Sequence, residues 1–264
     1  MQTLESIVEQ QRGVVTRAVA VSFLGASAVR WRLATGRWQR PWPGVLATHS
    51  GPLDDEQRMW VAILSAGRGA VLAGLTAAVL AGLRGFTCRS VHILVPPGRQ
   101  PKVGSGVVIR RSRFLGPEDV HPARLPPRTR LPRSLIDAAA WMPSGDQARA
   151  VLAAGVQQRL VRVQDLAAAL ERLTTVRRRR LMQQTLDDVA GGAHALSELN
   201  LTRLLRGYGL PAPDRQVVRY DERGRRRWVD AYFDRWRVVV EIDGMWHMEA
   251  STWWSDMLRD TPSR

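Results

Sequence analysis

The sequence contains one cysteine, Cys88, and one lysine, Lys102, among its 264 residues. A single cysteine excludes an internal disulfide and a zinc site built from cysteines, and it is typical of a protein from a reducing compartment. The most apolar stretch, residues 70–83, is interrupted by glycine and is too short to cross a bilayer. Residues 1–13 carry early acidic groups and no apolar segment of a signal peptide. These absences predict a cytoplasmic protein with no membrane partner.

Arginine carries nearly all of the positive charge. The chain has 39 Lys and Arg against 24 Asp and Glu, a net charge of +15 and a pI of about 11.5. Such a charge predicts a polyanionic partner, most commonly a nucleic acid. Codon usage can also enrich arginine, so its positions are more informative than its number. Arginine presents a rigid fork of donors that suits phosphates and guanine edges.

The first fifty residues predict short helices separated by turn signals. Apolar periodicity favours a helix from residue 4 to 11. Thr16 is placed to cap a second helix that ends at Gly25, and Ser27 is placed to cap a third. A hairpin around residues 41–44 follows. This order predicts a winged helix-turn-helix over residues 1–50.

Four arginines flank the element that would enter a major groove. The third helix carries Arg30 and Arg32, and the wing adds Arg37 and Arg40. In this motif the helix after the turn contacts base edges while neighbouring cations contact phosphates. We therefore predict these four residues to bind DNA. The alternative is a solvated helix whose arginines bind nothing.

Two further regions are expected between the winged helix and the C-terminal part. Helices over 53–66 and 70–83, followed by the β-prone runs VHILVP and GVVIRRS, predict a small α/β scaffold over residues 51–114. Within it, His92 and the basic residues 110–113 are interpreted as structural or solvated.

A proline-rich connector and a helical linker are predicted over residues 115–192, with helices over 133–141 and 146–173. Four consecutive arginines, residues 177–180, open the last helix of this region. They fit a solvated helix face and a phosphate contact about equally well.

The stretch WVDAYFDRWRVVVEIDGMWH, residues 228–247, predicts an antiparallel hairpin that reverses at residues 235–236. Paired residues then have numbers that sum to 471, which places Asp230 opposite Glu241 and Asp243 on the same face. Opposed carboxylates repel one another, and hard oxygen ligands suit Mg²⁺ or Mn²⁺. The spacing therefore predicts a metal held by Asp230 and Glu241, as phosphodiester hydrolysis requires. The alternative is a pair of solvent-facing carboxylates beside residues 225–227.

The segments SELNLTRLLRGYGLPAPDRQVVRY, RRRWVDAYF and RVVVEIDGMWH resemble the restriction-endonuclease-like domain related to very-short-patch-repair endonucleases, of the PD-(D/E)XK superfamily. The resemblance implies a hydrolase in which Asp230 and Glu241 bind the metal. It also implies Glu198 as the helix-borne acid and His247 near the scissile phosphate. Asp243 stands where the superfamily has lysine, which leaves His247 or the metal to activate water. The implied catalytic set is Glu198, Asp230, Glu241, Asp243 and His247.

The related fold continues with another strand and helix after the segment that this chain matches. We therefore expect residues 193–264 to form an endonuclease-like α/β core that lacks its last strand and helix. An unpaired sheet edge would result. An inactive nuclease remnant is accordingly kept as the alternative to an active enzyme.

The segments GVVTRAVAV, VRWRLATGRWQRPWPGVLAT and AVLAGLTAAVLAGL resemble the winged-helix module of AbiEi-type antitoxins of type IV toxin–antitoxin systems. The resemblance spans about residues 4–113. It implies DNA binding, autoregulation and a toxin as a partner.

Together these patterns predict an α+β protein that binds DNA and carries a Mg-dependent endonuclease-like C-terminal domain. The alternative is a non-enzymatic, antitoxin-like transcriptional regulator with an inactive nuclease remnant. An RNA-binding antitoxin-like protein is a third hypothesis, because a basic winged helix also binds structured RNA.

Overall fold

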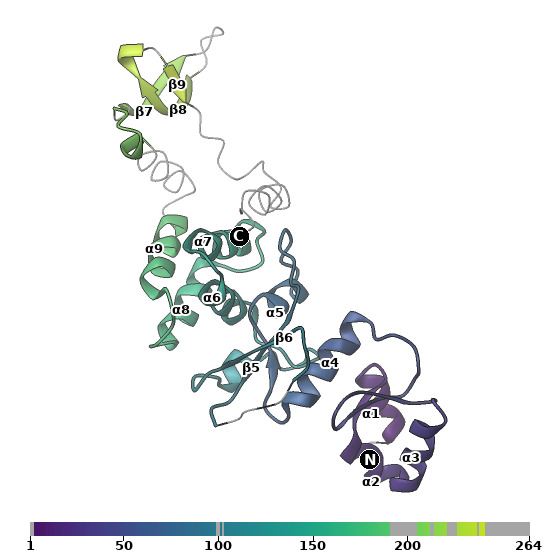
Figure 1. Ribbon diagram of the computed structural model, residues 1–264. Helices are drawn as coiled ribbons and strands as arrows, with labels where there is room; N and C mark the ends of the chain where they lie inside the picture. Colours follow the sequence, from purple (N-terminus) through teal and green to yellow (C-terminus); the bar gives the residue numbers. More distant parts are fainter. Residues whose placement is uncertain are drawn as a thin grey trace.

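The computed structural model describes residues 3–98, 101, 103–190, 205–211, 214–220, 226–236 and 238–240. It is an α+β protein, as the sequence predicts, and its described strands form three three-stranded sheets (Figure 1). Within the same residues, no helix is both long and apolar enough to cross a membrane.

The first module has the element order and strand pairing of a winged helix-turn-helix. Its elements are α1 (Leu4–Gln10), β1 (Val14–Thr16), α2 (Arg17–Leu24), α3 (Ala26–Ala34), β2 (Gln39–Trp42) and β3 (Val45–Ala47). Strand β3 lies between β1 and β2, and both pairings are antiparallel. The turn that joins β2 to β3 is the tip of the wing.

Local signals in the sequence define the two helices of the helix-turn-helix. Thr16 caps α2 as predicted, because its hydroxyl accepts a hydrogen bond from the Val19 amide at 3.2 Å. Gly25 ends α2 and is also the residue before α3, so the prediction that Ser27 caps the third helix is wrong. The physical reason is the backbone of Gly25, whose φ of +79° lets α3 begin directly after α2.

Helix α4 (Asp55–Ala66) joins the winged helix to the second module. Trp60 packs against Val14 and Val45 on one side of the small sheet. Ile63 and Ala66, on another face of α4, belong to the core of the second module. Figure 1 shows α4 between the two.

The second module contains a mixed sheet and a short helix. Its elements are β4 (Val71–Leu72), α5 (Gly74–Leu80), β5 (Val91–Val95) and β6 (Val107–Arg111). Strand β5 pairs antiparallel with β4 and parallel with β6. The predicted helix over 70–83 is therefore correct only in its middle part, Gly74–Leu80. Val71 pairs with Leu94 in the sheet, and the helix begins at Gly74, whose φ is +54°.

Four helices follow a short 3-10 turn, and they share one core with α5. The turn is η1 (Pro117–Asp119). The helices are α6 (Leu131–Trp141), α7 (Gly145–Gln157), α8 (Val163–Arg172) and α9 (Arg179–Ala190). Helices α7 and α8 lie within the predicted helical stretch 146–173, with a break at Arg159, whose φ is +55°. Helices α5 to α9 all contribute buried residues to the largest apolar cluster.

The proline-rich segment before α6 is bonded to the mixed sheet. The Leu72 amide donates to the Pro127 carbonyl at 2.8 Å, and the Thr129 amide donates to the Leu72 carbonyl at 2.9 Å. The predicted domain boundaries stay predictions. The packing shows that the residues on either side of position 114 are held together by one core and by these main-chain bonds.

The third sheet is antiparallel and contains the predicted hairpin. Its strands are β7 (Asp214–Tyr220), β8 (Arg226–Phe233) and β9 (Val238–Val240), with a 3-10 turn, η2 (Asp234–Trp236), between the last two. Strands β7 and β8 pair in a single register from Asp214 opposite Tyr232 to Tyr220 opposite Arg226.

Candidate functional site

Helix α3 has an apolar inner face and an outer face that is exposed. Val29 is fully buried in the core of the winged helix, and Leu33 packs against the same core. Ser27, Arg30 and Trp31 lie on the outer side, where Trp31 is 49% exposed. An exposed tryptophan beside arginine on this helix offers an aromatic face and a cation to a ligand.

The structure gives the four predicted DNA-binding arginines two different settings. Arg30, Arg37 and Arg40 are exposed. The guanidinium of Arg37 lies over the ring of Trp31, with 4.7 Å between its central carbon and the ring centroid. Arg32 is partly buried and donates to the Ala28 carbonyl at 3.1 Å. Its guanidinium also lies over the ring of Trp38, with 5.4 Å to the ring centroid, and so joins α3 to a residue that packs on the core, whereas the other three arginines face solvent.

Sequence reasoning missed three exposed side chains of the same module. Arg17 is exposed at the start of α2, and Phe23 is 48% exposed near its end. Trp31 is the third. Helical spacing alone could have placed Trp31 beside Arg30 and away from Val29. Between Glu9 and Asp54 the sequence has no acidic residue, so α2, α3 and the wing carry no carboxylate of their own.

The hairpin register predicted for the C-terminal part is confirmed in the three pairs that the structure describes. These pairs are Ala231 with Val240, Tyr232 with Val239 and Phe233 with Val238, and their numbers sum to 471. Asp230 lies on β8, one residue before Ala231, which belongs to the first of these pairs. Continuing the register by one residue places Asp230 opposite Glu241, which lies outside the described residues.

The rest of the predicted catalytic set also lies outside the described part of the chain. Glu198, Asp243 and His247 belong to the residues that the structure does not describe, as does Glu241. Among the described residues, no group of three or more His, Cys, Asp or Glu side chains could hold a metal. The metal site at Asp230 and Glu241 thus stays a prediction.

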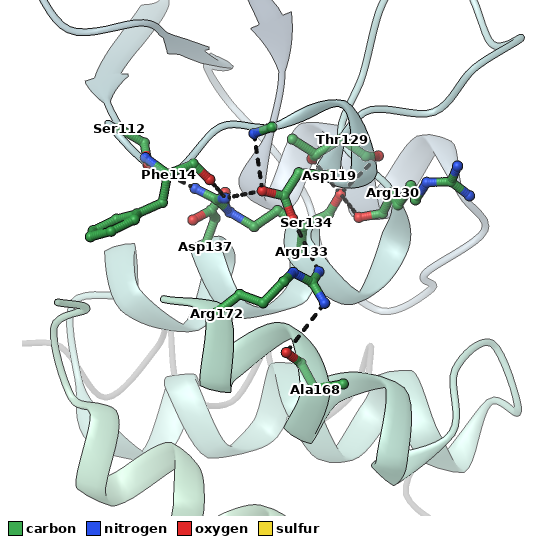
Figure 2. A network of polar contacts seen from close by, with 11 residues as sticks. Ser112, Phe114, Asp119, Thr129, Arg130, Arg133, Ser134, Asp137, Ala168 and Arg172 are labelled. Atoms are coloured by element: carbon green, nitrogen blue, oxygen red, sulfur yellow. Dashed lines mark hydrogen bonds and ion pairs between the residues drawn. The ribbon is translucent and has the colours of Figure 1, made fainter. Parts of the chain in front are cut away.

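A buried ion network joins α6 to three neighbouring segments (Figure 2). Arg133, which is 2% exposed, donates to Asp119 at 2.8 Å and to Asp137 at 2.9 Å. The same guanidinium donates to the Phe114 carbonyl at 2.8 Å and to the Ser112 hydroxyl at 3.1 Å. The network therefore fixes the end of β6 and the 3-10 turn η1 to α6.

Arg172 extends the network to α8. Its guanidinium donates to Asp119 at 3.2 Å, and to the Ala168 carbonyl at 3.2 Å (Figure 2). Burial raises the pKa of the Asp137 carboxyl from 3.8 to about 6, while the charge and hydrogen bond of Arg133 oppose that rise. Like-charge repulsion from Asp119 makes a smaller contribution to the rise of the Asp137 pKa.

The raised pKa of Asp137 predicts a pH-dependent loss of stability. A carboxyl that binds its proton more tightly in the folded state contributes stability that is complete below pH 3.8 and is lost as the pH rises through about 6. We expect the free energy of unfolding of the unmodified chain, relative to Asp137→Asn, to fall by about 3 kcal/mol between pH 4 and pH 7. Urea unfolding at several pH values measures this difference.

The matched control is Asp146→Asn, because Asp146 is exposed and pairs with Arg149 only three residues away. Its difference from the unmodified chain should stay within about 0.5 kcal/mol over the same pH range. A flat or rising difference for Asp137→Asn would contradict the prediction.

The four arginines at 177–180 have distinct environments. Arg178 has a φ of +63° and donates to the Pro143 carbonyl at 2.8 Å, just beyond the end of α6. Arg179 donates to the Leu170 and Leu173 carbonyls at 2.6 Å, at the end of α8. Both cations therefore cap helix C-termini. Arg177 and Arg180 are exposed.

The described residues thus define an α+β protein with a winged helix-turn-helix at its N-terminus. No family model matches the chain, and no curated protein matches it. Among solved structures, the crystal structure of the RV2827C protein from Mycobacterium tuberculosis is similar, with a TM-score of 0.45 and 20% sequence identity. The similarity covers 73% of this chain and 78% of that chain. A likeness this weak carries no argument about function.

Proposed function

We propose that the chain is a DNA-binding protein whose winged helix places α3 in the major groove. The observation that carries this proposal is the exposure of Arg30, Arg37 and Arg40, together with the stacking of Arg37 on the exposed Trp31. The three arginines lie on α3, on the turn after it and on the wing strand β2. In winged helix-turn-helix proteins these elements meet base edges and phosphates.

We further propose that the C-terminal residues form an endonuclease-like domain that hydrolyses DNA phosphodiesters. The support is the register of β8 and β9, in which the next pair would be Asp230 and Glu241. Two facing carboxylates supply the hard oxygen ligands that Mg²⁺ or Mn²⁺ prefers. When bound there, the metal would activate water and offset charge on the scissile phosphate. The resemblance to PD-(D/E)XK nucleases adds Glu198, Asp243 and His247 to this site.

DNA binding is tested by a triple substitution on the proposed face, Arg30→Ala, Arg37→Ala and Arg40→Ala. Each arginine that contacts a phosphate contributes about 0.9 to the slope of log K against log salt concentration. We expect the slope to decrease by about 2.7 and the affinity for duplex DNA to fall about 100-fold at 0.1 M salt. Fluorescence anisotropy at several salt concentrations measures both. Arg32 is left unchanged because it is partly buried and stacks on Trp38.

The control removes the same charge elsewhere, with Arg58→Ala, Arg149→Ala and Arg162→Ala. Each of these arginines pairs with an aspartate three residues away, on α4, on α7 or at the start of α8. The control should keep the salt slope and most of the affinity. Equal losses in the two variants would mean that net charge, and not the face around α3, governs binding, and the proposal would then be abandoned.

A further inference from the structure

A cavity of about 360 Å³ lies between the end of β6, the helix α6 and the segment that joins α8 to α9. This volume falls within the range of pockets that hold small molecules. The cavity shares no residue with α3, the wing or the C-terminal sheet. Its charged lining residues are Arg110, Arg111, Arg133, Arg177 and Asp137.

The cavity has an excess of positive charge, since four arginines and one aspartate line it. Asp137 already accepts a hydrogen bond from Arg133. Within the described part of the chain, Arg110 and Arg177 form no ion pair, and both are exposed. By contrast, the neighbouring Arg178 is engaged, because it donates to the Pro143 carbonyl just beyond the end of α6. Two cations are thus free to bind an anion at the cavity.

The inner wall of the cavity is fixed by buried groups. Arg133 is 2% exposed, and its Nη2 donates to the Ser112 hydroxyl, which also lines the cavity. The positive field at this place is visible in His92, whose pKa is lowered first by burial and then by the charge of Arg110.

The remaining walls are apolar and include two aromatic rings. They are formed by Leu94, Phe114, Ala140, Trp141, Leu173 and Val176. The ring of Trp141 is held edge-on against His92, with 5.7 Å between the ring centroids. It also closes over Gly74, where an added Cβ would lie 2.3 Å from the ring. These two contacts fix the position of the Trp141 ring.

We propose that this cavity binds a phosphate-bearing small molecule of nucleotide size. Arg110 and Arg177 would bind the phosphate, and the aromatic wall at Phe114 and Trp141 would contact the flat part of the ligand. A phosphate is favoured over a carboxylate because it carries a charge of about −1.5 to −2 and three acceptor oxygens, which suits more than one arginine. The proposal is independent of DNA binding by α3.

The test is calorimetric titration of the full chain with AMP as the probe, beside adenosine and inorganic phosphate. We expect AMP to bind, adenosine to bind at least about tenfold more weakly, and inorganic phosphate to compete with AMP. Arg177→Ala and Arg110→Ala should each weaken AMP binding about tenfold, the effect of losing one charge-assisted hydrogen bond. Arg180→Ala is the matched control, because Arg180 is exposed on α9 and does not line the cavity.

Three results would overturn the proposal. They are the absence of AMP binding, equal binding of adenosine and AMP, and AMP binding that both substitutions leave unchanged. Titration with duplex DNA tests whether the phosphate that the cavity binds belongs to a nucleic-acid backbone. If Arg110→Ala and Arg177→Ala weaken DNA binding and AMP does not bind, the cavity serves the nucleic-acid backbone and the small-molecule proposal is wrong. Circular dichroism of each variant confirms that it is folded, and Arg177, an exposed residue outside the helices, carries the test if Arg110→Ala is unstable.

Discussion

Replacing Arg133 with methionine should lower the free energy of unfolding by about 3–5 kcal/mol, the cost of leaving a buried charge without its partner. Methionine has a similar length but cannot donate to Asp119 or Asp137, which are 3% and 5% exposed. The Phe114 carbonyl and the Ser112 hydroxyl would lose a donor as well. Urea unfolding at pH 7 measures the loss.

The matched control for this substitution is Arg58→Met. Arg58 pairs with Asp55, and the two side chains are 59% and 86% exposed. Exposed pairs contribute about 0–1 kcal/mol, so the control should remain close to the unmodified chain. Because loss of Arg133 raises the pKa of Asp137 further, the Arg133→Met variant should be less impaired at pH 5 than at pH 8. A loss below about 1 kcal/mol would show that the network does not hold α6 in place.

Replacing Asp230 with alanine should abolish metal-dependent DNA cleavage. Metal coordination supplies several kcal/mol of transition-state stabilisation, so we expect the rate to fall on the order of 1,000-fold. Glu241→Ala should have the same effect, because Glu241 is the predicted partner of Asp230 in the hairpin. Nicking of supercoiled DNA with Mg²⁺ or Mn²⁺, with a chelator as the blank, measures the rate.

Asp234→Ala is the control for the nuclease site, since Asp234 lies in the turn at the other end of the same hairpin. This variant should cleave as the unmodified chain does. Cleavage that persists in Asp230→Ala would refute the proposed site. If the unmodified chain binds DNA with a strong salt dependence and does not cleave it, the chain is a DNA-binding regulator without nuclease activity.

Local signals in the sequence were sufficient wherever one turn determines the structure. Thr16 caps α2, and Gly25 separates the two helices of the helix-turn-helix. The turn at residues 234–236 determines the register of the C-terminal hairpin, because each strand residue has one partner once the reversal is known. For the same reason the sequence predicts Glu241 opposite Asp230, and this pair stays a prediction because Glu241 lies outside the described residues.

Contacts between distant segments were beyond local reasoning. Residues 71–72 lie in an alanine-rich run that predicts a helix. They form β4 instead, because β5 supplies hydrogen-bond partners for their main-chain groups. The run of four arginines gave no indication that Arg178 and Arg179 would cap α6 and α8. Which carbonyls a side chain reaches depends on helix packing, and the packing depends on the whole core.

The sequence by itself determined the charge of the protein, which follows from its composition. It also determined the winged helix-turn-helix and the hairpin that carries Asp230, because short turns between elements adjacent in the chain define both. The tertiary structure alone decided which arginines are available to a ligand. Arg133 is buried between two carboxylates, whereas Arg110 and Arg177 face the same cavity without an ion pair among the described residues. All three are the same residue type, and only the packing of β6, α6 and α9 gives them different partners.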